Sequence, residues 1–121
     1  MPSCTYLLET SCKFEDTYIY GTPFTKRWDT LAFQGTEEEL QNRWASVPGS
    51  TDIILSHGPM YGIGDWEVQG THLGSYAMWD TVARVEPKLL VHGHIHGCPG
   101  IYKYGSTTVI NSARTSFTVE M

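Results

Sequence analysis

Two short stretches decide the fold: "TDIILSHGP" at residues 51–59 and "KLLVHGHIHG" at residues 88–97. Each begins as an apolar run in which hydrophobic and polar residues do not alternate. Such a run predicts a strand that is buried on both faces, here at 51–56 and 88–93. In both stretches histidine and glycine follow directly after the expected strand.

The segment between these strands has two parts. Residues 57–72 are glycine-rich and irregular, whereas residues 73–86 have the composition of a helix, which Pro87 ends. Strand, loop, helix and strand in this order predict a βαβ unit, in which the two strands are parallel. The sequence therefore predicts the α/β class.

The flanking residues predict further elements. Segments 5–9 and 17–21 are rich in β-branched and aromatic residues and read as strands. Residues 35–44 predict a helix, in which Thr36 caps the first turn and Glu39 completes a capping box.

After the second apolar strand, residues 101–111 predict a hairpin with Gly105 and Ser106 as a two-residue turn. Residues 116–119 predict an edge strand. No repeat, linker or low-complexity tract divides the chain, so we expect residues 1–121 to form a single domain.

Composition excludes several classes of protein. The 121 residues carry 8 Lys and Arg against 13 Asp and Glu, and no basic stripe fits a nucleic-acid backbone. No apolar run approaches the roughly 20 residues that span a bilayer, and the first residues do not resemble a secretory signal. The odd set Cys4, Cys12 and Cys98 contains no C-x-x-C pair, which predicts a reduced, cytoplasmic setting.

Three histidines stand at predicted strand ends. His57 follows the first apolar strand, and His94 and His96 follow the second. Neighbouring strands lie about 4.8 Å apart, and residues two apart along an extended chain are about 6.6 Å apart on the same side. The three imidazoles can therefore reach one small volume and bind a metal, whereas His92 lies within the strand and reads as a structural residue.

These motifs resemble a known family. "ILSHGPMYGIGDW", followed some thirty residues later by "VEPKLLVHGHIHG", resembles the last two motifs of the calcineurin-like metallophosphoesterases. The resemblance is closest to the branch called metallophosphoesterase-domain-containing proteins, and "YIYGTPF" and "GIYKYGSTTVINSA" extend it over nearly all of residues 4–113.

The resemblance implies an αββα sandwich that holds two divalent metals and hydrolyses phosphomonoesters or phosphodiesters by metal-activated water. It implies that His57 and His94 are ligands of the second metal and that His96 is a ligand of the first. The metal would be Mn, Fe or Zn. Asp65 and His72 match loop positions beside the substrate, although Asp65 could equally cap a turn.

The family pattern has three further motifs, D-x-H, G-D-x-x-D and G-N-H-[DE], which this sequence lacks. We therefore expect the C-terminal half of the fold, a single partial metallophosphoesterase domain over 1–121. Without the bridging carboxylate at most one ion is expected, such as Zn²⁺ on three histidines with an open position. The chain is then either a truncated phosphoesterase or an inactive metal- or nucleotide-binding remnant or regulatory subunit.

The expected partners follow from the same reading. A small phosphoester or nucleotide would be the substrate, while membranes and nucleic-acid backbones would not bind. The apolar strands at 51–56 and 88–93 need a protein cover, so we expect either a homodimer or an association with the missing N-terminal half.

Overall fold

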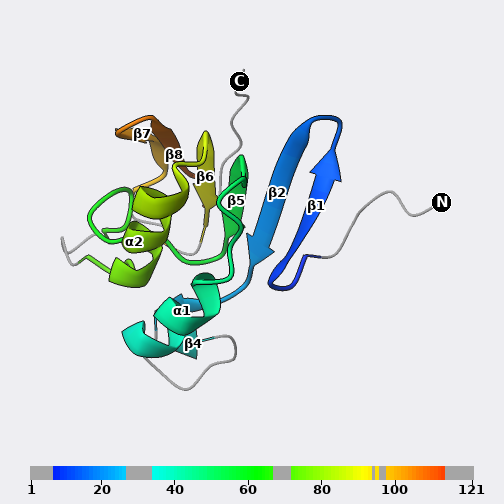
Figure 1. Ribbon diagram of the computed structural model, residues 1–121. Coiled ribbons are helices and arrows are strands. Elements are labelled where there is room, and N and C mark those ends of the chain that lie inside the picture. Colours follow the sequence, from blue (N-terminus) through cyan, green and yellow to red (C-terminus); the bar gives the residue numbers. More distant parts are fainter. Residues whose placement is uncertain (1–6, 27–33, 67–71, 94, 96–97, 114–121) are drawn as a thin grey trace.

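The computed structural model describes residues 7–26, 34–66, 72–93, 95 and 98–113. Within them, a six-stranded sheet has the order β1-β2-β5-β6-β8-β7, a two-stranded ribbon pairs β3 with β4, and two helices lie on one face of the sheet (Figure 1). The elements are β1 (Thr10–Phe14), β2 (Thr17–Thr22), β3 (Thr25–Lys26), β4 (Gln34–Gly35), α1 (Glu37–Trp44), β5 (Ile53–Ser56), α2 (Tyr76–Val85), β6 (Leu89–His92), β7 (Gly100–Tyr104) and β8 (Thr107–Asn111).

The centre of the sheet is parallel. β5 pairs with β6 in parallel, with Ile54 opposite Leu90, and α2 connects them. β2 and β5 also pair in parallel around α1, which adds a second βαβ unit. The antiparallel strands β1 and β7 form the two edges. The predicted βαβ unit and the α/β class are therefore confirmed.

One face of the sheet carries the hydrophobic core. Tyr20, Ile54, Leu90 and Val109 lie in one row across β2, β5, β6 and β8, and all four are buried. The helices cover this row with Leu40, Trp44, Ala77, Met78, Val82 and Val85. Burying each large aliphatic side chain contributes about 1.5–3 kcal/mol, so this single layer holds the sheet and helices together.

The opposite face of the sheet is only partly covered. Leu55 is 40% exposed and Val91 is half-buried, although both belong to the central strands. Leu7 packs close to Gly21 on this face, where an added Cβ would lie 2.4 Å from the Leu7 Cβ. The prediction that 51–56 forms a strand buried on both faces is therefore wrong, because the described residues cover β5 from the helix side alone.

The predicted helix and turn signals are confirmed. Thr36 and Glu39 form the reciprocal capping box of α1. Gly105 takes a φ of 59° in the turn between β7 and β8, which favours a residue without a side chain. α2 begins later than predicted, because Ser75 caps it and Gly74 packs so closely that an added Cβ would lie 2.2 Å from the Met60 carbonyl oxygen.

The first predicted strand is wrong. Residues 7–9 of the predicted 5–9 are not extended strand, and β1 occupies Thr10–Phe14 instead. The hairpin with β2 sets this register, with Thr10 opposite Gly21, and Glu9 turns into the left-handed region at a φ of 53°. Pairing thus overrides the local strand propensity of the preceding residues. The predicted strand at 116–119 lies outside the described residues.

The two helices cap one another. The Glu37 carboxylate, at the start of α1, accepts hydrogen bonds of 2.6 Å from the Ser75 hydroxyl and the Tyr76 backbone N–H at the start of α2. At the other end, the Arg84 guanidinium donates to the Trp44 carbonyl oxygen at 3.1 Å. Each helix therefore stabilises a terminus of the other, where backbone groups lack partners within their own helix.

We predict that Glu37→Ala destabilises the protein by about 1–2 kcal/mol, because it removes two charge-assisted hydrogen bonds at a helix start. Urea unfolding monitored by circular dichroism measures the change. Glu38→Ala is the matched control, since Glu38 is exposed on the same turn, and it should stay within about 0.5 kcal/mol of the wild type. Equal losses in both variants would contradict the role of Glu37.

Candidate functional site

Parallel pairing brings two strand ends together. Ser56 lies opposite His92 in the β5–β6 register, and the Gly93 N–H donates to the His57 carbonyl oxygen at 3.3 Å. His57 therefore lies beside Gly93, which directly precedes His94 in the sequence. Both are at the carboxyl edge of the sheet, where α/β proteins commonly bind their ligands. His94 and His96 lie outside the described residues, so their convergence with His57 stays a prediction.

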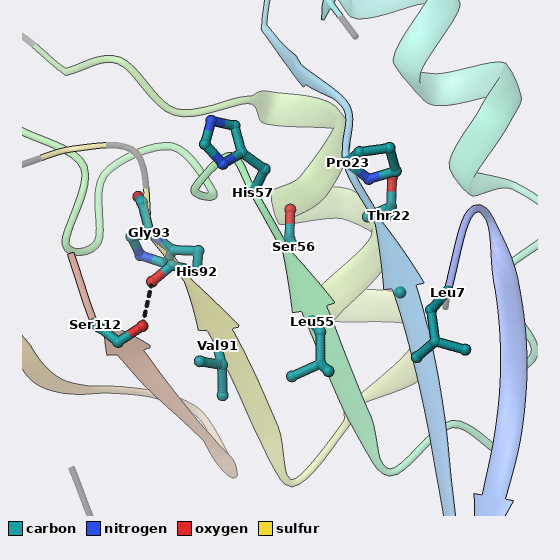
Figure 2. A pocket seen from close by; sticks show the side chains of 11 residues that line it. Leu7, Thr22, Pro23, Leu55, Ser56, His57, Val91, His92, Gly93 and Ser112 are labelled. Atoms are coloured by element: carbon teal, nitrogen blue, oxygen red, sulfur yellow. Dashed lines mark hydrogen bonds between the residues drawn. The ribbon is translucent and has the colours of Figure 1, made fainter. Parts of the chain in front are cut away.

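A cavity of about 440 Å³ lies at this edge. It extends over the carboxyl ends of β2, β5 and β6, where the side chains of Leu7, Leu55 and Val91 project from the partly covered face (Figure 2). The lining is completed by Gly21, Thr22, Pro23, Ser56, His57, His92, Gly93 and Ser112. The cavity thus combines an apolar floor with imidazole, hydroxyl and backbone groups at its rim.

His57 has a perturbed acidity. Its side chain stays accessible to solvent at the end of β5, yet partial desolvation by the surrounding protein lowers its pKa from the ordinary 6.5. Desolvation disfavours the imidazolium. His57 is therefore neutral at physiological pH, which is the form that binds a metal ion.

His92 differs from His57 in its surroundings. Its side chain is buried, and its Nδ1 lies 3.1 Å from the Gly93 carbonyl oxygen. A carbonyl oxygen can only accept, so Nδ1 is the donor in this contact. The structure places His92 in the interior, as expected for a strand residue.

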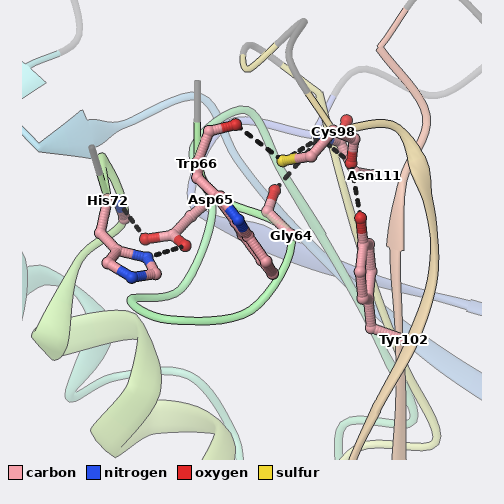
Figure 3. Close-up of polar contacts among 8 residues, drawn as sticks. Gly64, Asp65, Trp66, His72, Cys98, Tyr102 and Asn111 are labelled. Atoms are coloured by element: carbon pink, nitrogen blue, oxygen red, sulfur yellow. Dashed lines mark hydrogen bonds and ion pairs between the residues drawn. The ribbon is translucent and has the colours of Figure 1, made fainter. Parts of the chain in front are cut away.

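Asp65 and His72 form a pair in the loop after β5. The Asp65 side chain is 0% exposed, and its carboxylate contacts His72 Nδ1 at 2.8 Å and accepts from the Gly74 N–H at 3.0 Å (Figure 3). The contact with Gly74 ties Asp65 to a residue nine positions later, just before the start of α2, and the substrate-side role of Asp65 stays a prediction. The carboxylate accepts from the Nδ1–H of His72, which leaves Nε2 as the ring nitrogen available for other contacts.

Aromatic rings flank this pair. The His72 ring lies 5.1 Å from the ring centre of Tyr61 and 5.6 Å from that of Trp66. Trp66 pairs with His72 through an isolated antiparallel bridge, which folds the loop back on itself. The loop therefore holds His72 in a defined orientation although 37% of its side chain is exposed.

Asn111 was missed in the sequence analysis. It ends β8 and is fully buried, and its amide joins the Gly64 loop to the loop at Ile95 and Cys98 (Figure 3). The Cys98 thiol adds a contact of 2.8 Å to the Trp66 carbonyl oxygen, and burial raises the pKa of this thiol. The available signal was the place of Asn111 as the last residue of the predicted hairpin at 101–111.

The described residues meet the ligand requirement of a metal only in part. His57 supplies a neutral imidazole at the cavity, which suits Mn, Fe or Zn. Within residues 7–26, 34–66, 72–93, 95 and 98–113, no group of three or more His, Cys, Asp or Glu side chains could hold an ion. The other predicted ligands, His94 and His96, lie outside the described residues.

Comparison with known proteins identifies the family. The model of the calcineurin-like phosphoesterases matches residues 7–98, which include the strand-end site and the Asp65–His72 loop. The chain belongs to the calcineurin-like phosphoesterase family. Members of this family generally use divalent metals, in agreement with the resemblance found in the two histidine motifs.

Two relatives agree with this assignment, and a solved structure shares the fold. The chain is 32% identical to the UPF0046 protein C25E10.12 of Caenorhabditis elegans over 93% of its own length and 42% of the relative. It is 31% identical to human metallophosphoesterase domain-containing protein 1, over 93% of its own length and 36% of the length of that protein. The crystal structure of TT1561 of Thermus thermophilus shares the fold, with a TM-score of 0.59 and 15% sequence identity. The match covers 87% of this chain and 48% of TT1561.

The chain thus spans less than half the length of each of these proteins. It therefore represents part of the domain that they contain, as the expected partial αββα sandwich requires. None of the helices in the described part of the chain is long and apolar enough to cross a membrane.

We predict that His57 titrates with a midpoint below 6.5, because desolvation lowers its pKa. The unfolded chain, with a pKa near 6.5, then binds the proton more tightly than the folded chain. Protonation of His57 therefore lowers the free energy of unfolding as the pH falls below about 6.5. NMR titration of the imidazole protons measures the midpoint, and His57→Gln assigns the signal. A midpoint above 6.5 would contradict desolvation as the dominant influence on this imidazole.

Proposed function

We propose that the chain is the C-terminal part of a metal-dependent phosphoesterase that hydrolyses a phosphomonoester or phosphodiester. One observation supports this proposal most: His57 and the residue before His94 are hydrogen-bonded neighbours at the carboxyl edge of a parallel sheet. The two histidine motifs that resemble those of the calcineurin-like family reach this edge at His57 and Gly93.

In this proposal His57, His94 and His96 hold one divalent ion. When bound, a divalent ion lowers the pKa of water and neutralises charge on phosphoryl oxygens. His57 contributes a neutral imidazole, and its lowered pKa keeps it neutral at pH values where an ordinary histidine is partly charged. The cavity beside it accepts the substrate, with Ser56 and Ser112 hydroxyls at its rim.

His72 is proposed to act on the substrate side of the loop. Its Nδ1 is held by the buried Asp65 carboxylate, so Nε2 can exchange a proton or a hydrogen bond with a bound phosphoester. The flanking rings of Tyr61 and Trp66 restrict its rotation. Asp65 is then a positioning residue for His72.

The decisive experiment compares two histidine variants. The purified chain is assayed for bound metal and for hydrolysis of an aryl phosphodiester with added Mn²⁺. His57→Ala should lose both bound metal and turnover, because it removes a ligand. His72→Ala should keep the metal and lower turnover about 100-fold, the size expected for losing proton transfer.

Loss of metal in His72→Ala, or retention of metal and turnover in His57→Ala, would contradict these roles. A chain that binds metal without turnover would support the second candidate, an inactive metal- or nucleotide-binding subunit. The lack of the motifs D-x-H, G-D-x-x-D and G-N-H-[DE] from the sequence favours that candidate. We propose a cytoplasmic location for either function, since Cys12 and Cys98 are free thiols.

We further propose that another layer of protein covers the partly exposed sheet face. Leu55, Val91 and Ile101 project from this face, and Ile101 is 52% exposed. A second copy of the chain could supply the cover, as could a segment that corresponds to the remaining length of the relatives. Either one would bury apolar surface at about 25 cal/mol per Å².

We predict that the chain self-associates through this face at micromolar concentration. Leu55→Lys should shift the sedimentation profile towards the monomer, because it places a charge in the apolar contact. Trp79→Lys is the matched control on the outer side of α2, since Trp79 is 39% exposed and Leu55 40%. A wild-type chain that sediments as a monomer would contradict the prediction of a dimer.

A further inference from the structure

Asn111 joins two loops that are far apart in the sequence. Its Nδ2 donates to the carbonyl oxygens of Gly64 at 3.1 Å, Ile95 at 2.9 Å and Cys98 at 3.1 Å. Its Oδ1 accepts from the Ala113 N–H at 3.0 Å. A side-chain amide has two hydrogens, so three acceptors share them in a bifurcated arrangement at a site closed to solvent.

The orientation of this amide is unambiguous. All three carbonyl oxygens are acceptors and the Ala113 N–H is a donor, so exchanging Nδ2 and Oδ1 would turn every contact into a repulsion. An aspartate at this position would have the same shape. It would keep the hydrogen bond from the Ala113 N–H and lose all three donated bonds. It would also place a negative charge next to three carbonyl oxygens, which repel it.

The segments that Asn111 joins are those that follow β5 and β6. Gly64 belongs to the loop that begins at His57, and Ile95 stands between His94 and His96 in the sequence. The Ile95 side chain is buried, which fastens its loop to the protein from the other side. The Cys98 thiol, bonded to the Trp66 carbonyl oxygen, makes a second connection between the same loops.

The pairing of β6 with β8 places the amide between these loops. His92 lies opposite Asn111 in the register, so the first residue after β6 and the side chain of Asn111 start from the same level of the sheet. The backbone ladder fixes the strands only up to this level. Beyond it, the three hydrogen bonds of Asn111 join the two loops, together with the bond from the Gly93 N–H to the His57 carbonyl oxygen and the contact of the Cys98 thiol with the Trp66 carbonyl oxygen.

We propose that Asn111 is a positioning residue that holds the loop after His57, at Gly64, and the loop of Ile95 and Cys98 at a fixed separation, and that metal affinity depends on it. The second half of this statement rests on the proposed metal site. Asn111 touches neither metal nor substrate in this role, and acts through the backbone of the two loops.

The test compares Asn111→Asp with Asn42→Asp, the same change at an exposed position of α1. In the metal-free chain, backbone amides of Leu73, Gly93 and Ile95 should exchange at least about tenfold faster in Asn111→Asp, because three donated hydrogen bonds are lost and the loss of one bond of ordinary strength already gives about this factor. Amides inside β6 should keep their rates. Asn111→Ser, which retains a single donor, should fall between Asn111→Asp and the wild type.

Titration with Co²⁺ tests the second half. Asn111→Asp should bind Co²⁺ about 10- to 100-fold more weakly, the usual effect of losing a residue that orients ligands, and its visible absorption spectrum should change. Asn42→Asp should match the wild type in both measurements.

Unchanged exchange rates of the loop amides would overturn the positioning role. Equal acceleration of the β6 amides and the loop amides would also overturn it, because it would indicate general unfolding. An unchanged Co²⁺ affinity and spectrum would overturn the dependence of the metal on Asn111. If the wild type itself binds no Co²⁺, the proposed metal site fails together with this dependence, and amide exchange still decides whether Asn111 fixes the loops.

Discussion

The parallel pairing of β5 with β6 is the constraint on which the rest of the structure depends. It requires a crossover, and α2 provides it while covering the sheet. It also brings the carboxyl ends of both strands to one edge, so that His57 and Gly93 become neighbours although 35 positions lie between them in the chain. The cavity, the loop of Asp65 and the amide of Asn111 are all built outward from this edge.

The sequence predicted features that depend on local chemistry. The capping box of Thr36 and Glu39, the turn at Gly105 and the βαβ order each follow from residue types at short spacing. The position of His57 at a strand end followed from the same kind of pattern. The first strand was placed too early, because the register of the β1–β2 hairpin depends on a partner strand and not on the propensity of residues 5–9.

The remaining features depend on contacts between distant segments. Nothing in the local sequence of Asn111 shows that its amide will lie under two loops, since this depends on the order of three parallel strands. The exposure of Leu55 is of the same kind: an apolar run predicts burial on both faces, but burial requires atoms on each side. The Asp65–His72 contact joins residues seven apart through a loop whose shape no periodicity predicts.

The reciprocal capping of α1 and α2 has a consequence for motion. Glu37 of the first helix holds the start of the second, and Arg84 of the second holds the end of the first. Neither terminus can fray without releasing a group on its neighbour, so the helical layer is coupled as one cooperative opening unit. Because the first turn of α2 follows the loop of Asp65, the contacts of Glu37 connect that loop to α1, a helix that does not line the cavity.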